Sequence, residues 1–263
     1  MTPALNLARV RAGLGSQLAG STLLWYPTLD STQAELRRQV AAGAPLGTVV
    51  GTETQTAGQG RRGRRWQDRP GQDLLFSIFL PQPRMSPGLL PVALGAGLAE
   101  ALAELTGVEI QFQWPNDLVL EQAKLGGMLV EQVRGQFLLG LGVNVLGGEP
   151  LAALAARERI TLEAAARQPL VREPVLVTCL KAIEAVCHEE SAERLSRVIA
   201  ERDALRGQRV AVERPGTREA LRGIGAGIAP EGTLLVAISQ GVAPAPEMVE
   251  VRVADAVKVE AEV

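Results

Sequence analysis

The most restrictive feature of the sequence is the stretch DLLFSIFLP at residues 73–81, which is apolar at nearly every position. A strand with one face in water alternates polar and apolar side chains, so we expect this strand to be buried on both faces. With 263 residues, of which 46% are hydrophobic, the chain is long enough for one large domain with its own core and one small domain.

Two helices have recognisable ends. The first is expected at 29–43, with Thr32 as its capping residue, and the second at 86–107, between Ser86 as its cap and Gly107. The other elements expected before residue 207 are a strand at 47–54, a strand within 109–120 that Pro115 breaks, a hairpin at 126–146 that turns at 134–136, and a long helix at 173–205.

After Gly207 the sequence changes to short strands separated by turns that contain Pro215-Gly216 and Glu231-Gly232. This pattern is typical of a small β-barrel or sandwich. We therefore expect a mixed α/β domain at 1–206, followed by a small β domain at 207–263.

The overall charge and the cysteines exclude several classes of function. A net charge of −2 argues against general binding of nucleic acids or membranes. Cys179 and Cys187 lack the spacing of zinc ligands and His188 is the only histidine, so we expect buried thiols and no metal site built from them. The longest apolar run, at 89–99, is interrupted by Pro91 and is too short for a membrane span. Together with the absence of a targeting signal, these features indicate a cytoplasmic protein.

A basic loop, QTAGQGRRGRRW at 55–66, places four arginines among glycines. Glycine lets the backbone approach a ligand closely, and arginine offers a planar charged fork that suits carboxylate and phosphate. One interpretation is a loop that closes over an anionic small molecule. A solvated disordered loop and an RNA-binding segment are the alternatives.

A second motif, WPNDLVLEQAKLGGMLVE at 114–131, carries Lys124 seven residues after Asp117 and just before Gly126-Gly127. A lysine that enters a buried strand is costly unless an anion pairs with it, so Lys124 is a candidate anion-binding residue; a surface lysine in a turn is the alternative. The chain has no Ser/His/Asp set and no G-x-x-x-x-G-K-[ST] stretch. Electrostatic catalysis around a developing phosphate charge is the remaining chemistry.

Taken together, these motifs resemble those of the bacterial biotin–protein ligases, in the order of that family and roughly with its spacing. The matching segments are DSTQ at 30–33, QTAGQGRRGRRW at 55–66, WPNDL at 114–118, KLGGMLVE at 124–131, GLGVNV at 140–145 and GIAPEGTLLV at 227–236. The resemblance implies an α/β (α+β) fold of the class II synthetase-like, biotin–lipoate ligase type. Such a fold has a central mixed β-sheet flanked by helices and a small C-terminal SH3-like β-barrel domain.

The same resemblance implies a two-step reaction. The biotin carboxylate attacks the α-phosphate of ATP with the help of Mg²⁺, which gives biotinyl-adenylate and pyrophosphate. A lysine of a biotin carboxyl carrier domain, usually that of acetyl-CoA carboxylase, then attacks the mixed anhydride. A homodimer formed through the central sheet is also implied.

Site residues are implied motif by motif. Lys124 is the first candidate for a catalytic residue, and Arg61 is the second. The residues expected to bind biotin are Ser31, Thr32, Gln33, Gln55, Gln59, Gly60, Arg61, Lys124, Gly126 and Gly127. Those expected to bind the nucleotide are Arg61, Arg64, Trp66, Asn116, Lys124, Asn144 and Arg252, with Asp117 orienting Mg²⁺ or Lys124.

Three departures from the family pattern affect these expectations. Gln59 replaces a frequent arginine, and Gln33 replaces a frequent asparagine. Only about 25 residues precede the DST motif, which leaves no room for the winged-helix domain of the bifunctional members. We therefore expect a ligase that binds no specific DNA. The rival interpretations are a lipoate–protein ligase and a non-catalytic nucleic-acid-binding module that uses the arginine loop.

Overall fold

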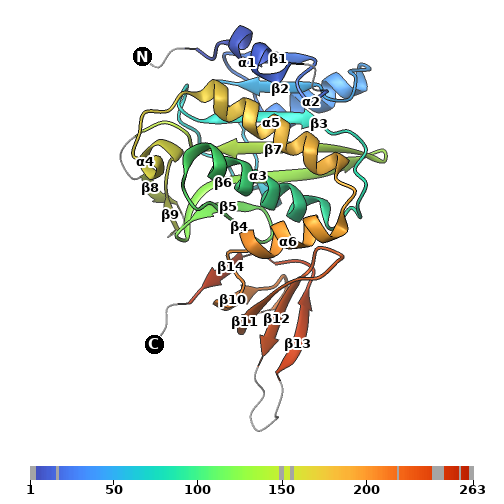
Figure 1. Cartoon of the computed structure of the whole chain (residues 1–263), viewed down its shortest axis with the longest axis vertical. Helices are drawn as coiled ribbons and strands as arrows, with labels where there is room; N and C mark the ends of the chain where they lie inside the picture. Colours follow the sequence, from blue (N-terminus) through green and yellow to red (C-terminus); the bar gives the residue numbers. More distant parts are fainter. Residues whose placement is uncertain are drawn as a thin grey trace.

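A computed structural model describes residues 4–15, 18–147, 151–154, 157–217, 219–238, 246–254 and 256–260. Its centre is a mixed sheet whose main path runs β1-β2-β3-β7-β6-β5-β4, with β9 paired to β6 and β8 paired to β9 (Figure 1). The strands are β1 (Leu23–Tyr26), β2 (Val49–Thr52), β3 (Leu74–Phe79), β4 (Gln111–Gln113), β5 (Asp117–Leu120), β6 (Ala123–Val133), β7 (Gln136–Val143), β8 (Leu151–Leu154) and β9 (Arg157–Arg159). The helices are α1 (Leu7–Leu14), α2 (Thr32–Ala41), α3 (Leu90–Thr106), α4 (Leu162–Ala166), α5 (Arg172–His188) and α6 (Ala192–Arg202).

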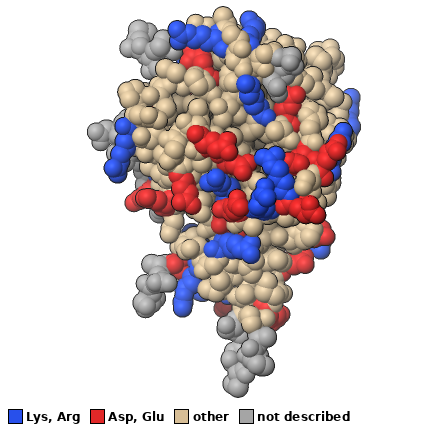
Figure 2. All heavy atoms as spheres, viewed as in Figure 1, with Lys and Arg blue, Asp and Glu red and all other residues tan. Residues whose placement is uncertain are grey.

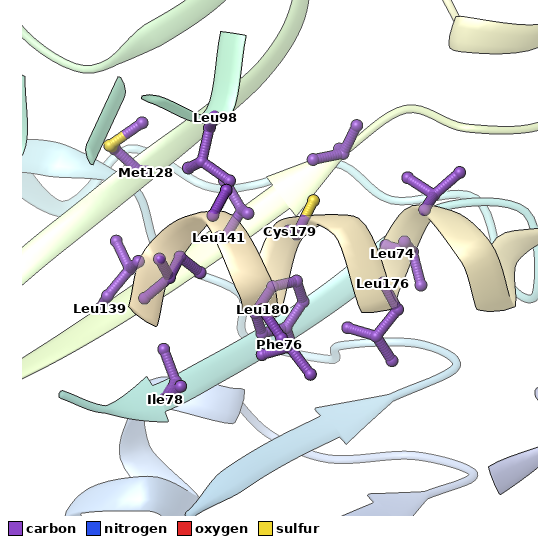
Figure 3. Close-up of a cluster of buried hydrophobic side chains, with 14 of the residues drawn as sticks. Leu74, Phe76, Ile78, Leu98, Met128, Leu139, Leu141, Leu176, Cys179 and Leu180 are labelled. Atoms are coloured by element: carbon purple, nitrogen blue, oxygen red, sulfur yellow. The ribbon is translucent and has the colours of Figure 1, made fainter. Parts of the chain in front are cut away.

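Strand β3 is buried at all six positions, as its apolar sequence predicts. One of its faces carries Phe76 and Ile78, which pack with side chains of β7 under helices α3 and α5 (Figure 3). Its other face packs Phe79 with Leu36 of α2. The apolar strand therefore lies between two layers of helix, and α2 covers one part of a sheet face whose other part is free to form a site.

The hairpin of β6 and β7 turns where the sequence indicates. Arg134 and Gly135 both have positive φ, at 51° and 82°, which is the conformation of a tight two-residue hairpin turn. Another turn joins β4 to β5, and it contains the cis bond between Trp114 and Pro115. The expected break of the strand at Pro115 is thus a change of strand direction.

Three expected element boundaries are wrong. Ser31, not Thr32, caps α2, because its Oγ accepts the amide of Ala34. Helix α3 begins at Leu90, after a turn in which the carbonyl of Ser86 accepts the amide of Leu90.

The third error concerns the long helix expected at 173–205, which is two helices, α5 and α6. Helix α5 ends at His188. Ser191 caps α6, because its side chain accepts a hydrogen bond from the amide of Arg194. Serine competes with the helical backbone for hydrogen bonds, which makes it a strong start signal.

The last part of the chain forms a second, antiparallel sheet in the order β13-β12-β11-β10-β14. Its strands are β10 (Arg209–Glu213), β11 (Leu221–Ile228), β12 (Leu234–Ile238), β13 (Glu247–Val251) and β14 (Ala256–Val259). This sheet agrees with the small C-terminal β unit that the sequence predicts, and it lies below α6 in Figure 1. It shares a core with the rest of the molecule, since Val210 and Val236 belong to the same apolar cluster as Phe112 and Trp114.

Charges of both signs are mixed on the face formed by α3, α5 and α6 (Figure 2). Arg194 illustrates the pattern, because it pairs with Glu189 at 2.8 Å and with Glu100 at 3.6 Å. This face thus has no large area of one sign. Within the described part of the chain, no helix is long and apolar enough to cross a membrane.

Candidate active site

The site lies on the sheet face opposite α3 and α5, and its floor is made of glycines. Strand register fixes this floor, because side chains paired across strands point to the same face. Ser77 of β3 pairs with Gly140 of β7, and one step further along β7, Gly142 pairs with Gly127 of β6. Gly140 and Gly142 are two residues apart, so the two rows lie about 7 Å from each other.

Each of these glycines allows a functional side chain to lie against the sheet. A Cβ at Gly140 would come within 2.8 Å of Gln33 Oε1, and one at Gly142 within 2.4 Å of the Trp66 ring. A Cβ at Gly127 would lie 3.1 Å from Asp117 Oδ1 and 3.2 Å from Lys124 Nζ. These positions lack side chains, and the space is taken by Gln33, Trp66, Asp117 and Lys124.

A group of neutral hydrogen-bonding residues surrounds the row at Gly140. The amide of Thr32 donates to Gln55 Oε1 at 2.9 Å, and Ser77 Oγ donates to Thr32 Oγ1 at 2.9 Å. Gln33 Nε2 donates to Glu131 Oε2 at 3.0 Å. Gln33 Oε1 is buried without a hydrogen-bond partner among the described residues. A buried carbonyl oxygen without a partner is costly, so this atom is placed to accept a hydrogen bond from a ligand.

Glu131 joins this group to the surface. It accepts a hydrogen bond from Gln33 and forms a bidentate pair with Arg37, whose Nη2 lies 2.8 Å from Glu131 Oε1. Arg37 is on α2 and nearly half of its side chain is exposed. Glu131 thereby fixes which end of the Gln33 amide faces the floor, because its carboxylate accepts from the NH₂ group and leaves the oxygen free.

Lys124 and Asp117 form a charged group at the row of Gly127. Lys124 Nζ lies 2.7 Å from Asp117 Oδ1, and also 5.6 Å from the centroid of the Trp66 ring. A β-bulge explains why the lysine lies on this face. The register shifts so that Leu118 pairs with Gly126 and Val119 pairs with Lys124, which leaves Leu125 as the extra residue. Leu125 turns into the core, and the bulge directs Lys124 to the opposite face.

The basic loop is folded into a small hairpin next to this charged group. The amide of Gly60 donates to the carbonyl of Arg64 at 2.7 Å, and that of Trp66 donates to the carbonyl of Gly58 at 2.9 Å. Arg61 is turned inward, where its Nη1 donates to Asn116 Oδ1 at 3.4 Å. Burial lowers the pKa of Arg61, and Arg62 lowers it further. An arginine stays charged after such a shift, so Arg61 is a partly buried cation beside Lys124.

The remaining candidate residues lie around these groups. Ser31 caps α2, and Gln59 and Arg64 lie on the exposed side of the loop hairpin. Gly126 and Gly127 are neighbours in a strand and point to opposite faces. Gly126 therefore faces the core, and of these two residues only Gly127 belongs to the floor. Arg252 follows the end of β13 and is exposed.

Arg252 and Asn144 are connected to the site less directly. The preceding residue, Val251, pairs with Leu234, two positions after Gly232, whose carbonyl accepts from Trp114 Nε1 at 3.0 Å. Arg252 thus lies at the end of the second sheet that contacts the turn containing Trp114. The Asn144 side chain is buried and donates to the carbonyl of Lys124 at 3.3 Å, so it holds the strand that carries the lysine.

Three site residues were not predicted from the sequence. Ser77 lies within the apolar strand, and its polarity is the only sequence feature that could have marked it as a site residue. Glu131 ends the KLGGMLVE motif but has no recognisable partner in the sequence. Arg159 is paired with Lys124 across β9 and β6, which is a contact between segments 35 positions apart that only the fold reveals.

The neutral group at Gly140 and the charged group at Gly127 together determine what the site can bind. A ligand with neutral hydrogen-bonding atoms at one end fits the group at Gln33, Thr32 and Ser77. A negatively charged part about 7 Å further along fits between Lys124 and Arg61. The nearby carboxylate, Asp117, is paired with the lysine. Among the described residues of the site, no side chain is arranged as a covalent nucleophile with a base.

A solved biotin protein ligase has this architecture. The structure matches "Biotin protein ligase from Aquifex aeolicus in complex with biotin and ATP" with a TM-score of 0.76 and 26% identity, covering 91% of this chain and 100% of the other. A family model, the biotin/lipoate A/B protein ligase family, matches residues 25–147.

Sequence relatives define the family. The chain is 30% identical to the biotin–[acetyl-CoA-carboxylase] ligase of Mycobacterium tuberculosis (strain ATCC 25618 / H37Rv), over 84% of this chain and 87% of that relative. It therefore belongs to the biotin/lipoate protein ligase family. It is also 30% identical to the bifunctional ligase/repressor BirA of Bacillus subtilis (strain 168) over 149 residues, and the match spans 46% of that protein's length.

Proposed function

We propose that this chain is an ATP-dependent biotin–protein ligase. It forms biotinyl-5′-AMP and then transfers biotin to a lysine of the biotin carboxyl carrier domain of acetyl-CoA carboxylase. The observation that carries this proposal is the glycine floor with a neutral hydrogen-bonding group at one end and two cations at the other.

The neutral group suits the ureido ring of biotin. That ring has two N–H donors and one carbonyl acceptor, and Gln33 Oε1 is a buried acceptor in need of a donor. Thr32 Oγ1 and Ser77 Oγ lie 2.9 Å apart beside it and offer further hydrogen-bonding atoms. The dithiolane ring of lipoate has no N–H groups and would leave Gln33 Oε1 without a partner, so the lipoate alternative is disfavoured.

The cationic group suits the step in which charge moves. As the biotin carboxylate attacks the α-phosphorus, a P–O bond forms to the carboxylate, the bond to the bridging oxygen breaks, and pyrophosphate leaves with the electron pair. Lys124 and Arg61 stabilise the charge on the phosphoryl oxygens. In the second step the carrier lysine attacks the biotinyl carbonyl, loses a proton to solvent and expels AMP, and the same cations stabilise the departing phosphate.

Magnesium enters this proposal with the nucleotide. No group of three potential metal-ligating side chains occurs among the described residues. Mg²⁺ commonly binds through one or two carboxylates together with substrate phosphates and water. Asp117, 2.7 Å from Lys124 Nζ, is the carboxylate placed to take part, and the ion would neutralise phosphate charge.

The partners follow from the same proposal. The acceptor is a carrier domain, and neither specific DNA nor a membrane is a partner. We also infer a homodimer through the central sheet, whose path ends at β1 and β4; sedimentation velocity tests it. A reducing cytoplasm suits the two buried free thiols, Cys179 and Cys187.

The decisive experiment is ATP–pyrophosphate exchange measured with biotin, with lipoate and without either acid. We expect exchange that depends on biotin and is absent with lipoate. Exchange with lipoate alone would identify a lipoate ligase, and no exchange with either acid would overturn the proposal. Transfer of labelled biotin to a purified carrier domain tests the second step.

A further inference from the structure

Arg159 is a cation on the site face that the reaction described above does not use. It is the Cα partner of Lys124 in the parallel pairing of β9 with β6, and the amide of Ile160 donates to the carbonyl of Lys124 at 3.0 Å. Side chains paired in this way point to the same face of a sheet, about 5 Å apart at Cβ. Arg159 therefore extends beside Lys124 over the floor of the site.

The hydrogen bonds of Arg159 use only one of its nitrogens. Nη2 donates to the carbonyl of Gln67 at 3.3 Å and to Asn144 Oδ1 at 3.3 Å, and both distances are long for a charged donor. Within the described residues, Nε and Nη1 donate to no protein atom. Gln67 directly follows Trp66, so the guanidinium lies at the junction between the basic loop and the strand that carries Lys124.

The charge of Arg159 is influenced by one acidic group, Asp73. Asp73 is fully buried and already bonded to Arg69 through both the amide and the guanidinium. No carboxylate in the described part of the chain forms an ion pair with Arg159. Burial lowers the pKa of Arg159, which reflects the cost of holding this charge partly out of water. Arg61, Lys124 and Arg159 thus all lie around the part of the site face where Asp117 pairs with Lys124.

We propose that Arg159 binds a phosphate oxygen of the nucleotide beside Lys124, through the N–H groups that the protein leaves unused. This inference rests on the proposed ligase function and adds a residue to its nucleotide subsite. The bonds to Gln67 and Asn144 orient the guanidinium, and the phosphate supplies the missing counter-charge. Arginine suits this position because Nη2 can hold two protein oxygens while Nε and Nη1 still carry N–H groups for a phosphate oxygen.

A role in positioning alone is the alternative, in which Arg159 only ties the loop to the strand. Comparison of Arg159→Gln with Arg159→Lys, read together with biotin affinity, separates the two roles. Glutamine removes the charge, and because its side chain is shorter it also gives up the bonds that Nη2 makes to Gln67 and Asn144. Arg159→Lys keeps the charge and loses the fork, and Arg197→Gln on the exposed face of α6 removes one positive charge far from the proposed contact.

The test is calorimetric titration of each variant with α,β-methylene-ATP and Mg²⁺ at saturating biotin, since this analogue cannot transfer its adenylyl group to biotin. We expect Arg159→Gln to weaken binding roughly 10- to 100-fold, the usual effect of losing a hydrogen bond to a charged group, and Arg159→Lys to weaken it less. Arg197→Gln should bind like the unmodified chain. Biotin affinity should change less than about twofold in all of them, and circular dichroism monitors the fold.

Three results would overturn the proposal. The first is nucleotide affinity that is unchanged in Arg159→Gln. The second is an equal loss of biotin affinity, which would indicate a structural role. The third is the absence of analogue binding by the unmodified chain. Biotin-dependent exchange, measured in parallel on the unmodified chain, reports separately on the proposed ligase function, because a chain that binds the analogue without exchange would refute only that function.

Discussion

Lys124 shows how one residue depends on a local irregularity of the backbone. Without the bulge at Leu125, strict alternation along β6 would place the lysine on the same face as Gly126, in the core. The extra residue turns it toward Asp117 and Trp66 instead. The sequence motif therefore encodes an orientation as well as a residue type.

Replacing Lys124 tests its role directly. We expect Lys124→Ala to fold normally and to lose biotin-dependent exchange by a factor on the order of 10² to 10³, because one charge-assisted contact in the transition state disappears. Lys181→Ala, on the exposed side of α5, is the matched control and should exchange normally. Near-normal exchange by a folded Lys124→Ala variant would exclude this role.

Gln33 is expected to determine biotin binding. Gln33→Leu keeps much of the side-chain volume and removes the buried acceptor, so the KM for biotin should rise roughly tenfold, while the KM for ATP stays unchanged. Gln132→Leu, at an exposed position of β6, controls for the loss of an amide. A Gln33→Leu variant with normal KM for biotin would place the ureido ring elsewhere.

Local sequence predicts some of these residues and not others. Lys124, Thr32 and Gln33 lie in motifs that are recognisable one at a time, and the structure brings them to one sheet face. Ser77 and Arg159 enter the site only through the pairings Ser77–Gly140 and Arg159–Lys124, which join distant segments. A register is a property of two strands together, so no single segment specifies it.

At the scale of elements, local sequence predicts a hairpin turn better than it predicts the end of a helix. The hairpin of β6 and β7 was predicted because Arg134 and Gly135 make the turn locally. The break between α5 and α6 was missed because apolar positions continue at helical spacing across it, while Ser191 is a single-residue signal. The spacing of apolar residues indicates which face of a helix is buried, but it gives little information about the residue at which the helix ends.

Trypsin tests the basic loop as a lid. The three glycines of the loop, Gly58, Gly60 and Gly63, increase its conformational freedom when no ligand is bound. The clustered arginines of the loop repel one another until an anion binds. We expect cleavage at Arg62, Arg64 or Arg65, which are exposed, and strong protection by biotin with ATP. Cleavage that proceeds equally fast with and without ligands would mean that the loop does not close over them.

At the scale of the whole molecule, the two sheets share one apolar cluster. Val92 and Phe112 pack with Val210, Val236 and other side chains of the second sheet. The division at residues 206 and 207 remains a proposal about sequence organisation. We expect a single cooperative unfolding transition by calorimetry; two separate transitions would show that the units are independent.

A buried ion pair should govern acid stability. Burial raises the pKa of Glu53, but bonds from Arg172 and Trp25 outweigh it, so the net pKa lies below 4.5. The pair therefore contributes stability that is complete above pH 4.5 and is lost as the pH falls through the lower pKa of the folded state.

Glu53→Gln removes the carboxylate that lies 2.7 Å from Arg172 Nη1, and the arginine is only 3% exposed. We expect the substitution to lower the free energy of unfolding at pH 7 by about 3 kcal/mol and to flatten the loss of stability below pH 4.5. Urea unfolding at a series of pH values measures both. An unchanged pH dependence would show that other carboxylates control acid unfolding.

The two cysteines of α5 provide a way to measure how often the folded protein opens. Burial raises the pKa of Cys179 and of Cys187 to about 12, so at neutral pH only roughly one thiol in 10⁵ is ionised in the folded state. An alkylating reagent can therefore react only with molecules in which α5 has left the sheet. The labelling rate then measures how often the native state opens, and cysteines introduced on the surface can carry probes without competition from these two.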